Sequence, residues 1–173
     1  MKKSVLITIM MIFISLAAFL IIRIIDSQEE QKLYESRIKQ LPQFSFTTLS
    51  GTSFSSSEVK NGPLLIVYFH PGCGHCEYEV SELCKSSLFE YGISVLLVSG
   101  AARDSVRNFL GRVSCPENDR LKTLIDTAAL FSTVFGKAII PSGYLYDRNL
   151  SLIDSFYGEY RIETILNRFR ESE

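Results

Sequence analysis

The residues of this chain best suited to chemistry are two cysteines, Cys73 and Cys76, which are separated by two residues. They follow an apolar, β-branched run at residues 64–69 and precede residues 77–83, whose composition predicts the start of a helix. Cysteines at this spacing in a strand-to-helix turn can close a small, easily reduced disulfide, which is the chemistry of thiol–disulfide exchange. The same spacing also occurs in zinc sites, but the position after a buried-strand pattern favours the redox interpretation.

The two cysteines are predicted to differ in role. Cys73 stands at the helix start, where unpaired backbone N–H groups and the helix dipole favour an anion, so its thiolate is the expected nucleophile. Cys76 lies three residues on, and it is expected to be less exposed and to resolve the mixed disulfide. His75 can donate to the Cys73 thiolate or lie charged beside it, which would make the pair more oxidising. The alternative for His75 is an exposed loop histidine of little effect.

A zinc site is the alternative for this cysteine pair, and it would need two more thiolates or imidazoles. The only candidates for these two further ligands are Cys84, Cys115, His70 and His75. A metal is therefore not expected, and neither is another cofactor. His70 ends the predicted strand and is expected to be a packed or loop residue. Cys84 is expected to pack in the helix as a small hydrophobe, with a Cys84–Cys115 disulfide as the alternative. Its helical rise of about 16 Å from Cys73 excludes pairing with that residue.

Length, charge and cysteine content narrow the class of protein. The chain has 173 residues, enough for one domain with a core. Its formal net charge is −1 and its body has no long basic run, so nucleic acid is not an expected partner. Four cysteines are too few for a disulfide-dense secreted scaffold and fit a reactive pair on an independently stable fold.

Residues 1–25 are predicted to be a single membrane-spanning anchor. After Lys2 and Lys3 the sequence is almost unbroken apolar as far as Arg23, close to the roughly 20 helical residues that cross about 30 Å. A cleaved signal peptide is the alternative, although its apolar stretch usually has only about 7–15 residues. By the positive-inside rule the two lysines stay cytoplasmic, so the rest of the chain is expected in the periplasm or another extracytoplasmic space.

After the anchor, the sequence predicts a polar linker at residues 26–41 and a folded domain at residues 42–173. Strands are predicted at residues 44–47, 52–54, 64–69, 93–98, 121–125, 142–146 and 151–155, and helices at residues 74–91, 103–110, 127–135 and 162–170. The alternation of strands and helices in the middle indicates a parallel core sheet with helices on both faces, to which the terminal hairpin adds antiparallel strands.

Three stretches of this domain together resemble the thioredoxin superfamily and, within it, the membrane-anchored TlpA/ResA-like branch. Residues 42–51 are similar to the branch's N-terminal hairpin entry, residues 64–76 to its strand and active-site loop, and residues 139–147 to its proline loop and following strand. The resemblance covers about residues 41–169. It implies an α/β thioredoxin-like fold, with a central mixed β-sheet flanked by helices and an N-terminal β-hairpin extension.

The resemblance also implies an activity and two further site residues. Members of this branch are membrane-tethered thiol–disulfide oxidoreductases, recharged by a membrane redox partner and acting on protein thiols and disulfides such as apocytochrome c or secreted chains. Pro141 corresponds to a cis-proline that lies against the active-site disulfide and helps to present the substrate backbone. Glu79 corresponds to an acidic residue that handles protons near the resolving cysteine. The alternative for Glu79 is a solvent-facing helix charge.

Two departures from the branch leave the direction of electron flow open. The family usually has Trp shortly before the first cysteine, whereas residues 69–72 here are Phe-His-Pro-Gly. The pair between the cysteines is Gly74-His75, as in protein disulfide isomerase, where this branch commonly has a proline. The chain is therefore expected to reduce, oxidise or isomerise protein disulfides.

Two other functions on the same fold are weighed against this one. A thiol peroxidase usually has Thr three residues before the reactive cysteine, and His70 occupies that position here. A non-enzymatic redox or copper-binding module usually separates its cysteines by three residues and adds a distant histidine, and this chain shows neither feature. Both are kept as alternatives to the oxidoreductase.

Overall fold

The computed structural model describes residues 2–59, 62–115, 118–136 and 138–172. The chain forms two compact units, Met1–Ser36 and Arg37–Glu173. The first consists of most of helix α1 (Lys2–Ile38), whose large apolar side chains between residues 10 and 25 are all at least half exposed. The sequence predicts a membrane-spanning segment here. Within the described part of the chain, no helix is both long enough and apolar enough to cross a membrane.

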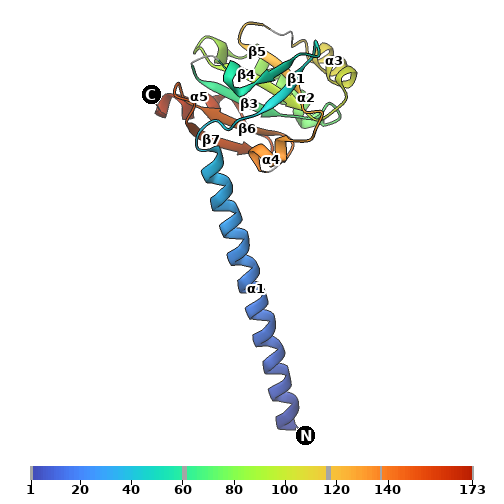
Figure 1. Ribbon diagram of the computed structural model, residues 1–173, viewed down its shortest axis with the longest axis vertical. Coiled ribbons are helices and arrows are strands. Elements are labelled where there is room, and N and C mark those ends of the chain that lie inside the picture. Colours follow the sequence, from blue (N-terminus) through green and yellow to red (C-terminus); the bar gives the residue numbers. More distant parts are fainter. Residues whose placement is uncertain (1, 60–61, 116–117, 137, 173) are drawn as a thin grey trace. The chain divides into compact units, whose positions relative to one another are not determined.

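The second unit is built on a seven-stranded mixed sheet (Figure 1). Its strands lie in the order β2-β1-β5-β4-β3-β6-β7, with β3, β4 and β5 parallel and the other neighbouring pairs antiparallel. This arrangement confirms the parallel core, the terminal antiparallel strands and the N-terminal hairpin extension. The strands are β1 (Ser45–Thr48), β2 (Ser53–Ser55), β3 (Leu64–Tyr68), β4 (Ser94–Ser99), β5 (Leu121–Ile125), β6 (Ser142–Tyr146) and β7 (Leu152–Tyr157).

The helices of this unit are α2 (Gly74–Lys85), α3 (Arg103–Arg112), α4 (Phe131–Phe135) and α5 (Ile162–Ser172), with short 3-10 turns at Ser56–Glu58 and Ser87–Phe89. Two of them are shorter than predicted. Helix α2 ends at Lys85 because the Ser86 hydroxyl and backbone N–H both donate to the Leu83 carbonyl, at 2.6 and 3.1 Å. Helix α4 begins late because the Asp126 carboxylate accepts from the N–H groups of Leu130 and Phe131.

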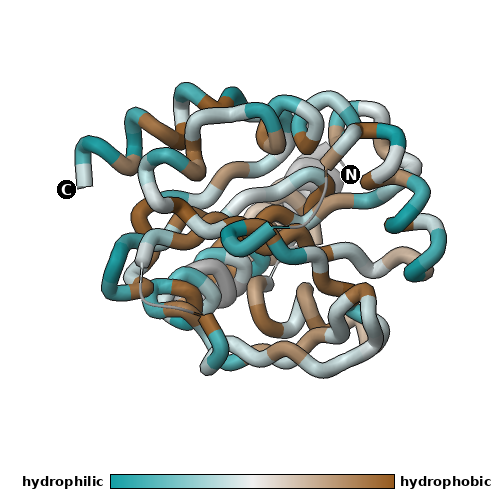
Figure 2. Tube along the Cα trace, turned by 90° about the horizontal axis from the view of Figure 1, so that it is seen from above, coloured by the Kyte–Doolittle hydropathy of each residue, from teal (hydrophilic) through white to brown (hydrophobic). Residues whose placement is uncertain are grey.

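The sheet separates two apolar layers, because successive strand residues point to opposite faces. On β3, Leu65 and Val67 belong to the buried cluster that also holds apolar side chains of α2, α3 and α5. Tyr68 faces the other way and stacks on Phe131 of α4, with ring centroids 4.0 Å apart. Hydrophilic and hydrophobic stretches alternate along α5 near the C-terminus (Figure 2). This agrees with the predicted amphipathic closing helix.

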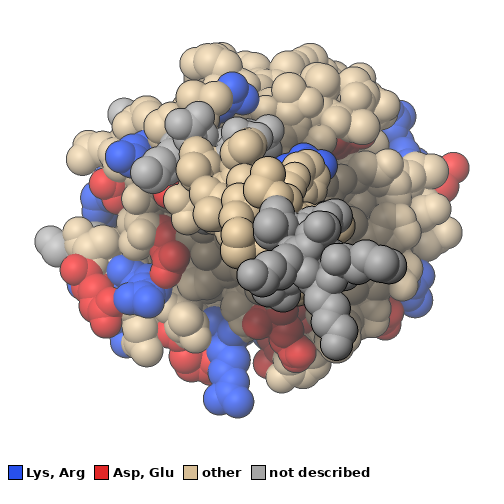
Figure 3. Space-filling view, turned by 90° about the horizontal axis from the view of Figure 1, so that it is seen from below, with Lys and Arg blue, Asp and Glu red and all other residues tan. Residues whose placement is uncertain are grey.

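The compact unit begins before the predicted domain boundary at residue 42. The Lys39 carbonyl accepts from the Leu152 N–H and the Leu41 N–H donates to the Leu150 carbonyl, each at 2.8 Å. Residues 37–41, predicted as linker, are therefore held by the backbone of the β6–β7 hairpin. Basic and acidic side chains are interspersed over the face of the molecule shown in Figure 3.

Candidate active site

The turn that carries Cys73 is positioned by the buried central strand β3. All five residues of β3 are buried, and Phe69, which follows them, is fully buried. Beyond Phe69 the chain turns sharply: the Cys73 N–H donates to the His70 carbonyl at 3.0 Å, and the Gly72 N–H donates to His70 Nδ1 at 3.1 Å. His70 is thus a loop residue, as predicted, and it shapes the turn that presents Cys73.

Cys73 occupies the N-cap position of α2. Its sulfur accepts the backbone N–H of Cys76 at 3.4 Å, so it lies where the unpaired N–H groups of the helix start converge. Cys73 is partly exposed, whereas Cys76 is fully buried, and neither is in a disulfide. The pair therefore has the asymmetry that exchange requires, with one sulfur open to a partner and the other beneath it.

The buried sulfur of Cys76 is held as a neutral thiol. Burial is the largest cause that raises the pKa of Cys76, and its hydrogen bond with Cys73 and the negative charges of Cys73 and Glu79 raise it further. A thiol must lose its proton before it can attack a disulfide. Cys76 therefore needs a neighbouring group that accepts its proton when it acts.

Glu79 lies one turn along α2 from Cys76 and is only 2% exposed. This burial contradicts the alternative interpretation of Glu79 as a solvent-facing helix charge. The pKa of the carboxyl is raised to about 7, mainly by burial; the Tyr160 hydroxyl opposes this rise, and the nearby charge of Glu159 adds to it. Neither carboxyl oxygen has a partner of regular hydrogen-bond geometry among the described residues. A carboxyl of this kind can accept and return a proton near neutral pH.

The His75 side chain contacts Glu159, whereas the sequence predicts that it interacts with the Cys73 thiolate. Its Nδ1 lies 3.4 Å from Oε2 of Glu159, and both side chains are well exposed, at 72% and 59%. An ion pair in this setting is worth little in stability. The ring lies at the surface between the cysteines and the β7–α5 turn.

Pro141 is brought beside the cysteine turn by the register of β3 and β6. Tyr68 pairs with Ser142, so Pro141 precedes β6 at the level where Phe69 leaves β3. The Ile140–Pro141 peptide bond is cis, which confirms that feature of the resemblance. The Pro141 carbonyl accepts the Gly158 N–H at 2.9 Å and so links the proline to the β7–α5 turn.

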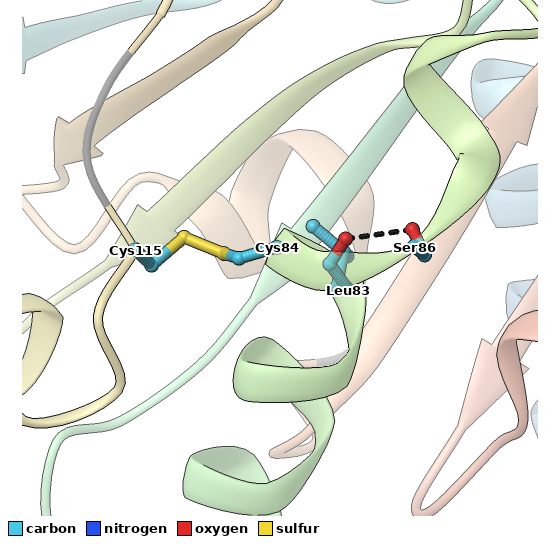
Figure 4. Close-up of a disulfide and its surroundings, with 4 residues drawn as sticks. All are labelled: Leu83, Cys84, Ser86 and Cys115. Atoms are coloured by element: carbon cyan, nitrogen blue, oxygen red, sulfur yellow. Dashed lines mark hydrogen bonds between the residues drawn. A yellow bond between two sulfur atoms is a disulfide. The ribbon is translucent and has the colours of Figure 1, made fainter.

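A disulfide joins Cys84, at the end of α2, to Cys115, in the loop that follows α3 (Figure 4). The expectation of a free, buried Cys84 is wrong, and the alternative pairing is confirmed. The loop brings the Cα of Cys115 to 5.5 Å from that of Cys84. Neither sulfur can then serve as a zinc thiolate. Among the described residues there is no group of three or more His, Cys, Asp or Glu side chains placed to hold a metal.

Two residues near this site are not found by sequence reasoning: Tyr160 and Glu159, which lie in the turn between β7 and α5. They reach Glu79 and His75 through the fold, and no spacing along the chain indicates the contact. The one available signal is Gly143 on β6, because a glycine inside a strand often marks a close approach by another group.

Comparisons with known proteins identify the fold. No protein-family model and no curated protein matches the sequence. Solved structures do match. They include a secreted Mycobacterium tuberculosis disulfide oxidoreductase homologous to Escherichia coli DsbE, with TM-score 0.63, 15% identity, and coverage of 77% of this chain and 96% of that one. A thiol:disulfide interchange protein of the thioredoxin family from Chlorobium tepidum has TM-score 0.64 and 16% identity, over 77% and 94% of the two chains.

A third structure is a peroxidoxin, BcpB from Mycobacterium tuberculosis, with TM-score 0.65 and 14% identity, over 78% of this chain and 96% of that one. The two oxidoreductases and the peroxidoxin are thus similar to this chain to the same degree. At these identities the likeness establishes the fold and leaves the activity to the site. The second unit of this chain has the α/β thioredoxin-like fold, with a mixed central sheet.

Proposed function

We propose that this chain is a thiol–disulfide oxidoreductase that exchanges disulfides with protein substrates through Cys73 and Cys76. The observation that carries the proposal is the position of the partly exposed Cys73 at the N-cap of α2. Its sulfur accepts a hydrogen bond, at 3.4 Å, from the backbone N–H of the fully buried Cys76. The thiol:disulfide oxidoreductases among the similar structures support it.

As a reductase, the pair works in two steps. The Cys73 thiolate attacks a substrate disulfide; one substrate sulfur leaves as a thiolate, and Cys73 becomes joined to the other. Cys76 then passes its proton to the Glu79 carboxylate and attacks the Cys73 sulfur. The Cys73–Cys76 bond forms, the bond to the substrate breaks, and its electron pair leaves with the second substrate thiolate. Two electrons have moved from the pair to the substrate, and oxidation of a substrate is the reverse.

The roles proposed for Pro141 and His75 follow from their positions. The proline lies beside the cysteine turn, with its carbonyl tied to the β7–α5 turn, and is proposed to face the backbone of a bound substrate. His75 is exposed beside Cys73 and is proposed to tune the reduction potential of the pair, with its ion pair to Glu159 weakening this effect.

Trapping the mixed disulfide tests the proposal. The reduced full-length chain with Cys76→Ser, mixed with glutathione disulfide, is expected to retain one glutathione on Cys73, visible as a mass increase of the intact protein. The unsubstituted chain is expected to release glutathione and close its own disulfide. Cys73→Ser is the matched control and is expected to form at most a slow adduct. Equal adduct formation in Cys73→Ser and Cys76→Ser would overturn the assignment of Cys73 as the nucleophile.

A thiol peroxidase is the second candidate, favoured by the likeness to the peroxidoxin. In that reaction Cys73 would attack hydrogen peroxide, break the O–O bond and become a sulfenic acid, which Cys76 would convert to a disulfide with release of water. Both candidates use the same two sulfurs, so they are separated by the oxidant. We expect the reduced pair to be oxidised faster by glutathione disulfide than by an equal concentration of hydrogen peroxide. The opposite order would favour the peroxidase.

We propose further that residues 1–25 tether the domain to a membrane, with the N-terminus cytoplasmic and the domain extracytoplasmic. The exposed apolar side chains of α1 between residues 10 and 25 support a tether, and the secreted oxidoreductase among the similar structures supports the location. Near the membrane, a membrane redox partner would recharge the pair. The substrates of this chain would be apocytochrome c or secreted proteins with cysteines.

A further inference from the structure

We infer that Tyr160 is a positioning residue for the exchange reaction: its buried hydroxyl is placed to orient the buried Glu79 carboxyl, so that this carboxyl can accept the Cys76 proton. The inference rests on the proposed function of the Cys73–Cys76 pair. Tyr160 would act through Glu79, without touching the substrate.

The first support is the isolation of the two polar groups. The Tyr160 hydroxyl and both Glu79 carboxyl oxygens are buried, and none has a partner of regular hydrogen-bond geometry among the described residues. Around them lies the apolar cluster that contains Val80, and the Tyr160 ring lies 5.2 Å from the ring of Phe156. Buried polar groups are costly to leave unpaired, and these two lie near enough for each to shift the pKa of the other.

The second support is the space that β6 leaves for the hydroxyl. A Cβ atom at Gly143 would lie 2.7 Å from the Tyr160 oxygen and 2.9 Å from the ring carbon that carries it. Any larger residue would displace the hydroxyl. Gly143 pairs with Val67 on one side and Phe156 on the other, so its backbone is fixed in the middle of the sheet. The phenol is therefore seated against the strand that follows Pro141.

The third support is the electrostatic direction of the contact. Among the described residues, the titratable groups that influence the Glu79 carboxyl, or are influenced by it, are Cys76 on its own helix, and Tyr160 and Glu159 on the β7–α5 turn. Burial and Glu159 raise the pKa of Glu79, whereas the Tyr160 hydroxyl lowers it. Tyr160 thus opposes the burial that would otherwise keep Glu79 protonated and unable to accept a proton.

A route to solvent completes the arrangement. Glu79 and Tyr160 both line an open groove between α2 and α5, whose charged lining includes Glu82, Lys85, Arg161 and Glu163. A proton that Glu79 takes from Cys76 would leave through this groove, which Glu79 itself lines.

The test is the Tyr160→Phe variant of the full-length chain, which keeps the ring and removes only the donor. We expect the titration midpoint of Glu79, followed by carbon NMR of labelled carboxyl groups, to rise by about one pH unit. The pH profile for release of glutathione from the Cys73 adduct should move by the same amount. Tyr78→Phe is the matched control, because Tyr78 adjoins Glu79 on α2 but is 63% exposed, and it should move neither midpoint.

An unchanged Glu79 midpoint in Tyr160→Phe would overturn the inference, and so would a shifted midpoint with an unshifted profile of glutathione release. Both failures differ from failure of the proposed function, in which Cys73 forms no adduct with glutathione at all. In that case the Glu79 titration still decides whether Tyr160 positions the carboxyl.

Discussion

At the scale of single residues, the Glu79 carboxyl titrates close to neutral pH because burial removes the water that would solvate its charge. An isolated glutamate on an exposed helix face would ionise far lower and would be a weak base for the Cys76 thiol. The same burial that makes the carboxyl useful in exchange makes its ionised form unfavourable for folding. Activity and stability are therefore linked at this residue.

Glu79→Gln is expected to remove a pH dependence of stability. The folded chain holds this proton up to about pH 7, whereas the unfolded chain loses it near 4.5, so the folded state binds more protons between these values. Stability therefore falls as pH rises through that window, by about 3 kcal/mol in total. Urea unfolding should show the variant more stable than the unsubstituted chain at pH 8 and not at pH 4.

The matched control for this prediction is Glu82→Gln on the same helix, whose side chain is 49% exposed. It should retain the fall in stability between acid and neutral pH. If Glu79→Gln and Glu82→Gln gave the same pH dependence as the unsubstituted chain, Glu79 would not be the buried titrating group.

The residues that could be predicted from the sequence are those whose contacts are local. Cys73, Cys76 and Glu79 lie within two turns of one helix, so their spacing fixes which face they share. Tyr160 reaches Glu79 only after β6, β7 and the turn beyond them have folded. The role of a tyrosine in such a turn depends on a contact between distant parts of the chain, and no local pattern reports it.

At the scale of elements, the Cys84–Cys115 disulfide fastens the end of α2 to the loop after α3. It closes a loop with a sequence separation of 31, for which chain entropy gives about 3–4 kcal/mol of stabilisation. The double variant Cys84→Ala, Cys115→Ala should lose about this much in urea unfolding. It should still close the Cys73–Cys76 disulfide, because the cysteine turn is built by β3 and His70. Loss of exchange in a folded double variant would contradict this separation of roles.

Gly143 on β6 is expected to be coupled to Tyr160. Gly143→Ala places a methyl group within 3 Å of the phenol oxygen and should destabilise the chain by about 1–3 kcal/mol. In a Tyr160→Ala background the added methyl group has room, and the loss should largely disappear. Urea unfolding of the two single variants and the double variant measures this coupling. Additive losses would show that the close approach does not exist.

The strands were predictable and two helix boundaries were not, for a physical reason. Buried β-branched runs such as β3 and β4 have no alternative to the sheet core, so their positions follow from composition. The last residue of α2 and the first residue of α4 depend on a few hydrogen bonds, donated by Ser86 and accepted by the Asp126 carboxylate. The same residues are compatible with a longer helix, and only the folded chain shows which bond forms.

At the scale of the whole molecule, membrane tethering is testable without shortening the chain. A charged residue at the centre of a spanning helix costs about 2.5–3.5 kcal/mol. The full-length chain with Ile14→Asp and Ala18→Asp should therefore leave the membrane fraction after an alkaline wash, while the unsubstituted chain stays. The control with Ile14→Leu and Ala18→Leu should also stay. An unsubstituted chain found free in the wash would contradict the tether.

Whether Cys73 and Cys76 form a reversible redox pair can be measured by equilibrating the full-length chain in thiol buffers of graded potential. After alkylation, mass analysis counts the free thiols at each potential. We expect one two-electron transition in which Cys73 and Cys76 change together, while Cys84 and Cys115 stay joined. A midpoint near −270 mV would indicate a reductase, and one between about −180 and −120 mV an oxidase or isomerase. Two thiols that never pair at any potential would contradict the account.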